Sequence, residues 1–172
     1  MRVREVALAA GLLVAAVGVV GTATRLDRLH VRTDAAWAAL DAALRHRARA
    51  VSALDGGALN SGSPDGAVLR YIADAVLCAG SHVAREEVEN ELGRALAVLD
   101  RTELESARAA RLADAEQRVV IARRVYNDAV RDTLALRSHR MVRLLRLAGT
   151  APLPRYFEIA EPVLPTNFAV SE

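Results

Sequence analysis

Lysine is absent from this sequence, and aromatic residues are rare. All 23 basic residues are arginines, and phenylalanine, tryptophan and tyrosine together make up 3% of the 172 residues. The 21 acidic residues are interspersed among the arginines and leave a formal charge of +2. Nucleic-acid-binding proteins usually carry a concentrated basic excess together with aromatic side chains that stack on bases. The composition therefore argues against a nucleic-acid partner.

Motifs that carry chemistry are missing as well. The chain has no glycine-rich phosphate loop, no HExxH and no histidine at nucleophile–base spacing. Asp74, Cys78, His82 and Glu86 follow one another at intervals of four, but a Gly-Ser pair at 80–81 interrupts the helix that would align them. Cys78, the single cysteine, cannot form an internal disulfide, and we expect a small buried apolar side chain there. We predict a protein that is not an enzyme and uses no cofactor and no metal.

Alanine, leucine, valine and arginine are abundant instead. A core built from alanine, leucine and valine with almost no phenylalanine is typical of helical proteins, and no stretch shows the clean alternation of a strand. About 150 residues follow the first apolar stretch, which is enough to bury a core without disulfides or metals. We predict an all-α protein in which a single N-terminal transmembrane helix precedes an elongated antiparallel bundle of three to four helices.

The transmembrane helix is predicted from residues 6–24, VALAAGLLVAAVGVVGTAT, which contain no charge. A helix of this length spans roughly 28 Å, close to the ~30 Å hydrocarbon core of a bilayer. We predict an anchor over residues 1–25 and a single-pass protein of the cell membrane. The alternative is a cleaved signal peptide with Gly21-Thr22-Ala23 as cleavage site, although the run exceeds the usual apolar region of about 7–15 residues. Arginines flank both ends, so the side of the membrane that holds the remaining chain stays open.

Small residues line one face of this helix and would let two copies approach closely in lipid, which predicts possible self-association. The alternative is that small residues simply fill an alanine-rich helix. The residues on this face are Ala7, Gly11, Ala15, Gly18 and Thr22.

Three helical segments are predicted before the longest one. The first continues the transmembrane helix, because no proline or glycine occurs from residue 22 to 55. The glycine-rich stretch 56–66 predicts a loop, and a second helix starts at Pro64, with Ser63 as N-cap, and ends near Ala79. A third helix is predicted over residues 85–100. The first helix carries an apolar face at heptad-like spacing, interrupted only by Arg47: Leu26, His30, Thr33, Trp37, Leu40, Leu44, Val51 and Leu54.

The fourth helix has the strongest periodicity, with eight positions spaced alternately three and four residues apart, as in a coiled coil. Thr102 is its expected cap, and the helix is predicted over residues 102–137. We assign the bundle to residues 26–148 and expect the proline-containing tail, residues 149–172, to be extended or disordered. The heptad positions are Leu112, Ala115, Val119, Ala122, Tyr126, Ala129, Thr133 and Leu136.

Three stretches carry distinctive motifs: Ala36-Trp37 with residues 40–47, residues 115–131 with their Tyr-Asn pair, and residues 155–158 (Arg-Tyr-Phe-Glu). In this order, they resemble the first helix, the last long helix and the ending of the LemA family. The chain departs from the family at residues 50–54, where a Pro-Asn pair is usual, at the glycine-rich loop, which replaces a more polar connection, and at Thr133-Leu134, where a second Asn is usual. The resemblance is that of a divergent member. It implies an anchored helical bundle of unsettled function and no catalytic residues.

Three residues are candidates for a structural or partner-binding role. Arg47 could span the bundle to pair with Glu116 or Asp128, or its stem could pack while its head reaches solvent. Tyr126 falls in the heptad seam, so we expect its ring in the core and its hydroxyl bonded or at the rim. Asn127 lies off the seam, and we expect it to be exposed, where it could cap a loop or contact a partner.

A membrane-anchored scaffold or adaptor that binds another membrane or envelope protein is the function we expect. The alternative is a protein that contacts lipid or shapes the membrane. This alternative rests on a basic amphipathic piece at residues 138–147, in which Arg140, Arg143 and Arg146 are candidate lipid contacts. Its position is open: the fourth helix ends near the membrane if it is antiparallel to the first helix, and far from it if the two are parallel.

Overall fold

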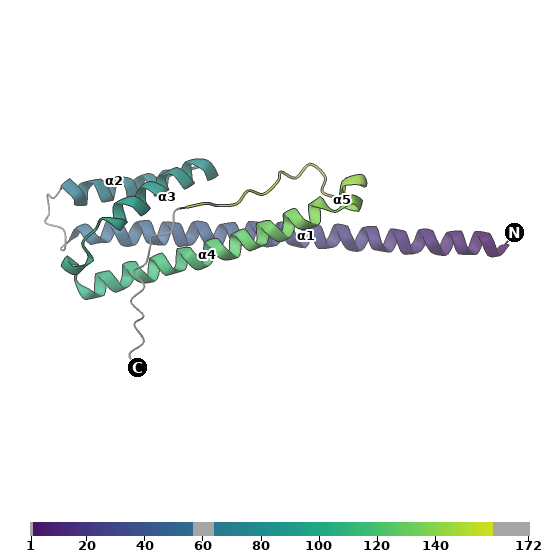
Figure 1. Ribbon diagram of the computed structural model, residues 1–172, viewed down its shortest axis with the longest axis horizontal. Coiled ribbons are helices and arrows are strands. Elements are labelled where there is room, and N and C mark those ends of the chain that lie inside the picture. The colour runs from purple at the N-terminus through teal and green to yellow at the C-terminus, as the bar shows by residue number, and fades with distance from the viewer. Residues whose placement is uncertain (1, 57–63, 160–172) are drawn as a thin grey trace, which may run out of the picture. The chain divides into compact units, whose positions relative to one another are not determined.

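The computed structural model describes residues 2–56 and 64–159, and these residues form helices and no strand (Figure 1). The prediction of an all-α chain is confirmed. The helices, with 3₁₀ helices written η, are α1 (Arg2–Ser52), η1 (Ala53–Gly56), α2 (Pro64–Cys78), α3 (His82–Ala97), η2 (Arg101–Glu103), α4 (Ser106–Ser138) and α5 (Arg140–Leu144).

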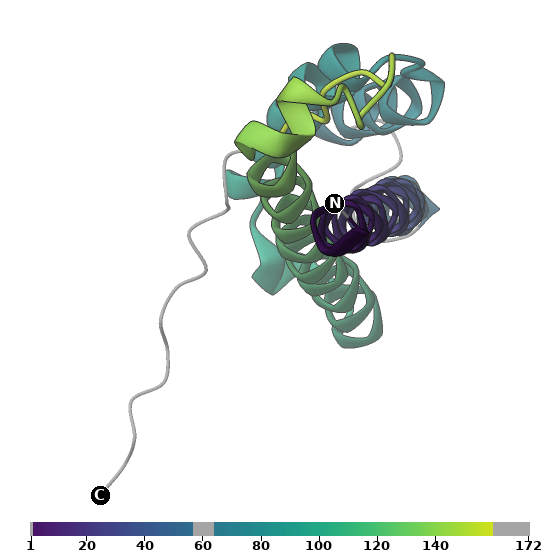
Figure 2. The same cartoon turned by 90° about the vertical axis from the view of Figure 1, so that its right-hand side faces the viewer.

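Helix α1 is a single helix of 51 residues, which Figure 1 shows from the side and Figure 2 nearly end-on. The prediction that the apolar helix runs straight into the next segment is therefore confirmed. Among the described residues, α1 is the one helix long and apolar enough to cross a membrane. Its hydroxyls are satisfied within the helix, because Thr22 and Thr24 donate to the carbonyls of Gly18 and Val20. Such bonds leave no unpaired side-chain donor for lipid to cover.

The apolar end of α1 is exposed. Leucine and valine side chains between residues 6 and 20 are about two thirds exposed, except Val19, which is partly buried. No residue of this apolar stretch is fully buried by the described parts of the chain. A Cβ atom added at Gly11 or Gly18 would have nothing within 4 Å, so the face of small residues is open. Self-association through this face stays a prediction.

Capping side chains explain where the predicted boundaries were wrong. Helix α3 starts at His82 instead of residue 85, because the hydroxyl of Ser81 accepts a hydrogen bond from the Ala84 N–H at 3.1 Å. Thr102 does not cap a long helix. Instead the Asp100 carboxylate accepts from the Thr102 N–H and caps η2, and α4 starts at Ser106. The expected N-cap Ser63 lies outside the described residues.

Contacts divide the chain into two compact units, and α1 and α4 contribute to both. Unit 1 comprises residues 1–38 and 125–156, and unit 2 comprises residues 39–124 and 157–172. In unit 2, α2 and α3 form a hairpin of two separate helices around the break at residues 79–81. The apolar core of unit 2 also includes residues outside this hairpin. It consists of Ala48, Val51, Leu54, Leu69, Ile72, Ala73, Val76, Leu92, Leu96, Leu104 and Leu112.

In unit 1, α1 and α4 are joined through two buried threonines. The hydroxyls of Thr33 and Thr133 lie 3.0 Å apart, and each also approaches a carbonyl of the opposite helix, Ala129 for Thr33 and Leu29 for Thr133. Arg32 adds an exposed ion pair with Asp132 at 3.0 Å. Threonine is small enough for close helix approach, and each hydroxyl finds a partner in the interface.

Candidate functional site

Trp37, Tyr126 and Arg155, one residue from each stretch that carries the sequence resemblance, lie together in unit 1. The ring of Tyr126 is buried and packs against Trp37 of α1, with ring centroids 5.4 Å apart and an angle of 57° between the planes. Its hydroxyl donates to the carbonyl of Arg155 at 2.8 Å. The prediction of a core ring with a bonded hydroxyl is confirmed. Asn127 is partly buried and has a contact, so the expectation that it is exposed was wrong.

The beginning of the tail is fixed to the protein. Residues 151–159 contain no helix, as expected, but Phe157 is fully buried in unit 2. Its ring meets His82 edge-on at 5.2 Å, and the Glu158 N–H donates to the Glu86 carboxylate at 2.8 Å. Residues 160–172 of the predicted tail lie outside the described residues. Phe157 was missed because one buried side chain in a proline-containing stretch gives no periodic signal.

Arg47 is buried and forms an ion pair with Glu89 of α3. Both predictions for its head group were wrong, because Arg47 neither reaches solvent nor pairs with the last helix. The two carboxylates expected as partners are engaged elsewhere, Glu116 with Arg101 at 2.7 Å and Asp128 with Arg131 at 2.9 Å. A buried arginine takes whichever carboxylate the packing places opposite it, and α3 carries that carboxylate here.

A second arginine completes this charge cluster in unit 2. Arg85 is buried, pairs with Asp41 at 2.9 Å and donates to the carbonyls of Val76 and Ala79 at the end of α2. Burial raises the pKa of Glu89 above its usual 4.5, although Arg47 and Arg85 act to lower it. The Nε of Arg47 and the Oε1 of Glu89 have no hydrogen-bond partner within the described residues. The cluster therefore links α1, α2 and α3, and two of its buried polar atoms lack a hydrogen bond among the described residues.

The structure separates the Asp-Cys-His-Glu stripe. Cys78 ends α2 and His82 begins α3, so the four side chains do not share one helix. Cys78 is exposed, which contradicts the expectation that it is buried. His82 lies 3.9 Å from Glu86 in an i, i+4 pair. Within the described ranges, no group of three or more histidine, cysteine or acidic side chains could hold a metal ion.

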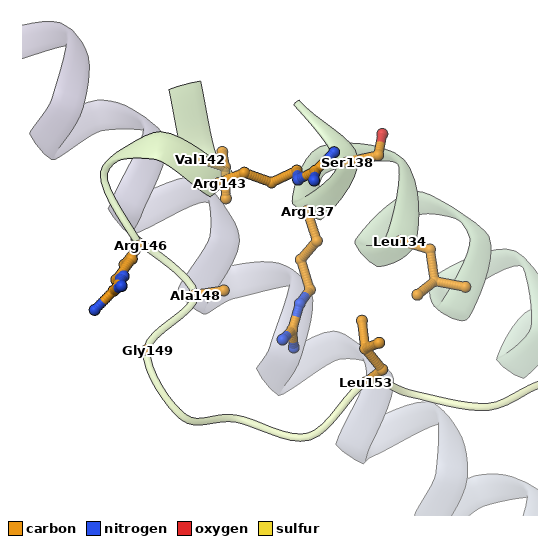
Figure 3. A pocket seen from close by; sticks show the side chains of 9 residues that line it. All are labelled: Leu134, Arg137, Ser138, Val142, Arg143, Arg146, Ala148, Gly149 and Leu153. Atoms are coloured by element: carbon orange, nitrogen blue, oxygen red, sulfur yellow. The ribbon is translucent and has the colours of Figure 1, made fainter. Parts of the chain in front are cut away.

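A basic cavity lies in unit 1 at the C-terminal end of α4 (Figure 3). Its volume is about 570 Å³, within the usual range of small-molecule sites. Arg137 lies 3.4 Å from the ring nitrogen of His30 and donates to the carbonyls of Ala151 and Pro152, which holds the following loop against α4. The cavity is lined by Leu134, Arg137, Ser138, Val142, Arg143, Arg146, Ala148, Gly149 and Leu153.

The predicted basic piece is only partly helical. Helix α5 covers Arg140–Leu144, and the Leu147 N–H then bonds to the Val142 carbonyl while the Arg146 N–H bonds to that of Arg143. This pair of bonds is a Schellman C-cap, with Arg146 at the left-handed position that glycine usually occupies. Arg146 is the one non-glycine residue with positive φ among the described residues, at 50°. A side chain in this conformation costs about 1 kcal/mol.

Folding concentrates positive charge around this cavity. Residues 25–34 of α1 lie beside the end of α4, and together with residues 133–156 they contain eight arginines and two aspartates. The rest of the chain contains 15 arginines and 19 acidic residues. Arg140, Arg143 and Arg146 have no salt bridge to any described residue. The sequence alone hides this excess, because the two stretches are a hundred residues apart.

Unit 2 contains another basic cavity, of about 620 Å³, between the ends of α1 and α4. Two of its four arginines form ion pairs: Arg108 pairs with Glu105 and donates to the Leu54 carbonyl, and Arg118 pairs with Asp114 at 2.7 Å. The hydrogen bond from Arg118 holds the pKa of Asp114 below its usual 3.8. This cavity differs from the one in unit 1 because a carboxylate, that of Asp114, is among its lining residues.

Comparison of the chain with family models, with curated proteins and with solved structures gives no match.

Proposed function

We propose that this chain is a single-pass membrane protein of the LemA type, which acts as a scaffold or adaptor for another membrane or envelope protein. One observation carries the proposal. Helix α1 continues without a break from its exposed apolar residues into buried positions of unit 1 and unit 2, among them Leu26, Leu40 and Leu44. A bilayer would cover the apolar residues, and the same helix would hold the packed helices at the membrane.

The proposal includes an antiparallel bundle. In unit 1, residue numbers fall along α4 as they rise along α1. Leu29 contacts Thr133, Thr33 contacts Ala129, and Trp37 contacts Tyr126. This order supports antiparallel packing of α1 and α4. It favours the arrangement in which α4 ends near the apolar end of α1 over the parallel alternative.

Exposed apolar side chains on helical faces support a role in protein binding. Tyr71 and Val68 of α2 are 75% and 53% exposed, and Ile121 and Val125 of α4 are about half exposed. Each pair lies on one face of its helix, three or four residues apart. Tyrosine at an exposed position offers a large rigid contact with a polar tip, which suits a protein interface.

Site-specific photocrosslinking in native membranes tests the proposal. A photoreactive residue replaces Tyr71, Ile121 or, as a control on a polar face, Glu91, which is exposed on α3. We expect one protein to be captured from Tyr71 or Ile121 but not from Glu91, and we expect Tyr71→Ser or Ile121→Ser to reduce its co-purification. Equal capture from all three positions, or capture from none, would overturn the adaptor role.

Contact with lipid is the second candidate function. It is favoured by the position of α5, because Arg137 at the preceding end of α4 lies beside His30, only six residues beyond the apolar run. Met141 and Leu144 of α5 are exposed, with Leu144 at 77%. Exposed apolar side chains next to unpaired arginines are typical of segments that lie in an anionic membrane surface.

A further inference from the structure

We infer that the cavity at the end of α4 is a binding site for the phosphate of an anionic phospholipid. The inference rests on the proposed anchoring by α1 and deepens the second candidate function, because it replaces a diffuse basic surface with a defined site. Three observations carry it: the level of the cavity relative to the apolar run, its unpaired arginines, and the conformation of Arg146.

The level of the cavity relative to the apolar run follows from the contacts between α1 and α4 within unit 1. Leu29 is opposite Thr133 and Thr33 is opposite Ala129. Extending this register by four residues places Arg137 opposite Arg25, which directly follows the apolar run that ends at residue 24. Each headgroup layer of a bilayer is about 5–8 Å thick, which corresponds to roughly three to five residues of helix. The cavity therefore lies at headgroup depth if residues 6–24 span the membrane.

The lining suits a phosphate with apolar groups attached. Figure 3 shows Arg143 reaching toward Ser138, Arg137 pointing between α4 and the following loop, and Arg146 extending from that loop. No acidic residue lines the cavity, and the sequence has none between Asp132 and Glu158. Arginine forks bind phosphate oxygens in pairs of hydrogen bonds. Leu134, Val142 and Leu153 of the cavity can contact the glycerol and upper acyl groups of a lipid.

Arg146 occupies a position where glycine would be more stable. The Schellman bonds of α5 need a left-handed residue there, and they would form equally well with glycine. Arginine is therefore less stable than glycine at this position. Arg146 lines the cavity, and Figure 3 shows its side chain extending from the loop away from Arg137 and Arg143. It has no ion-pair partner among the described residues. Residues held in unfavourable backbone conformations are common at ligand sites.

Titration of phosphatidylglycerol into the detergent-solubilised 172-residue chain, followed by native mass spectrometry, tests the inference. Phosphatidylcholine serves as the zwitterionic probe and inorganic phosphate as the free anion. We expect one phosphatidylglycerol to bind in preference to phosphatidylcholine. Arg143→Gln and Arg146→Gly should each weaken its binding about fivefold, the usual effect of one basic residue at an anionic lipid surface. Arg140→Gln is the matched control, because Arg140 belongs to the same helix but does not line the cavity.

The outcomes separate the possibilities. Arg146→Gly should keep or raise the thermal unfolding midpoint while it weakens binding, so that unfolding cannot account for the loss. Equal weakening by all three substitutions would mean diffuse surface charge, and equal binding of both lipids would mean no site. Displacement of phosphatidylglycerol by inorganic phosphate at similar concentrations would mean a site for a small anion. Any of these three results overturns the inference. None of them depends on whether α1 spans a bilayer, which alkaline extraction tests separately.

Discussion

At the scale of single residues, the buried pair of Arg47 and Glu89 shows what sequence reasoning could and could not reach. The heptad pattern correctly placed Arg47 on the buried face of α1, between Leu44 and Val51. Its partner could not be predicted, because pairing depends on how α3 packs against α1, and the pattern of α1 contains no information on that. Tyr126 was predicted more fully, since its ring needed only the seam of its own helix.

We expect Arg47→Met to destabilise the folded chain by about 3–5 kcal/mol, because it leaves Glu89 buried without a partner. The double variant Arg47→Met/Glu89→Leu should recover most of this loss, since both charges are then removed. Urea unfolding followed by circular dichroism at 222 nm measures both. Additive costs, with the double variant at least as unstable as the single one, would show that the pair is not coupled.

The pKa of Glu89 predicts a pH effect of known sign. Because its pKa is raised in the folded chain, the folded state binds this proton more tightly than the unfolded state. Glu89 therefore favours folding most below its unfolded pKa of about 4.5, and this contribution is lost as the pH rises through the folded value. The free energy of unfolding of wild type minus that of Glu89→Gln should rise as the pH falls from 7 to 4.5. A difference that is constant or falls would contradict the assignment.

At the scale of the helices, heptad periodicity predicted the buried face of α4 but missed features that depend on single contacts. Six of the eight heptad positions of α4 are buried, and Ala122 and Leu136 are partly buried. The start of α4, the short α5 and the anchoring of the tail were missed or misplaced. These depend on single contacts, such as Asp100 with Thr102 or Phe157 with His82, which sequence periodicity cannot predict.

The degree of burial along the α4 seam predicts unequal effects of the same substitution. Ala129 is fully buried opposite Thr33, so Ala129→Leu should overpack the interface and cost about 1–3 kcal/mol. Ala122→Leu is the matched control and should cost less, because Ala122 is partly exposed. Urea unfolding followed by the fluorescence of Trp37, which packs on Tyr126, reports on both. Equal costs at the two positions would mean that the seam does not close more tightly at Ala129.

At the scale of the whole chain, the modest formal charge conceals an uneven distribution. Eight arginines and two aspartates gather where the end of α4 lies beside residues 25–34 of α1, next to the uncharged run at residues 6–24. Proximity to an anionic bilayer would explain why this part is basic and the remainder acidic. The proposed adaptor role and the proposed lipid contact therefore both depend on whether residues 6–24 are retained in a membrane.

Alkaline carbonate extraction of membranes that contain the 172-residue chain tests this most directly. We expect the chain to stay in the membrane pellet and to keep the mass of the uncleaved sequence. Val14→Arg, which places a charge at the centre of the apolar run, should move a substantial part of the protein to the supernatant, because a central arginine opposes insertion by about 2.5–3.5 kcal/mol. Release of the intact wild-type chain by carbonate, or loss of the first 23 or so residues from the mature protein, would contradict membrane anchoring by residues 6–24.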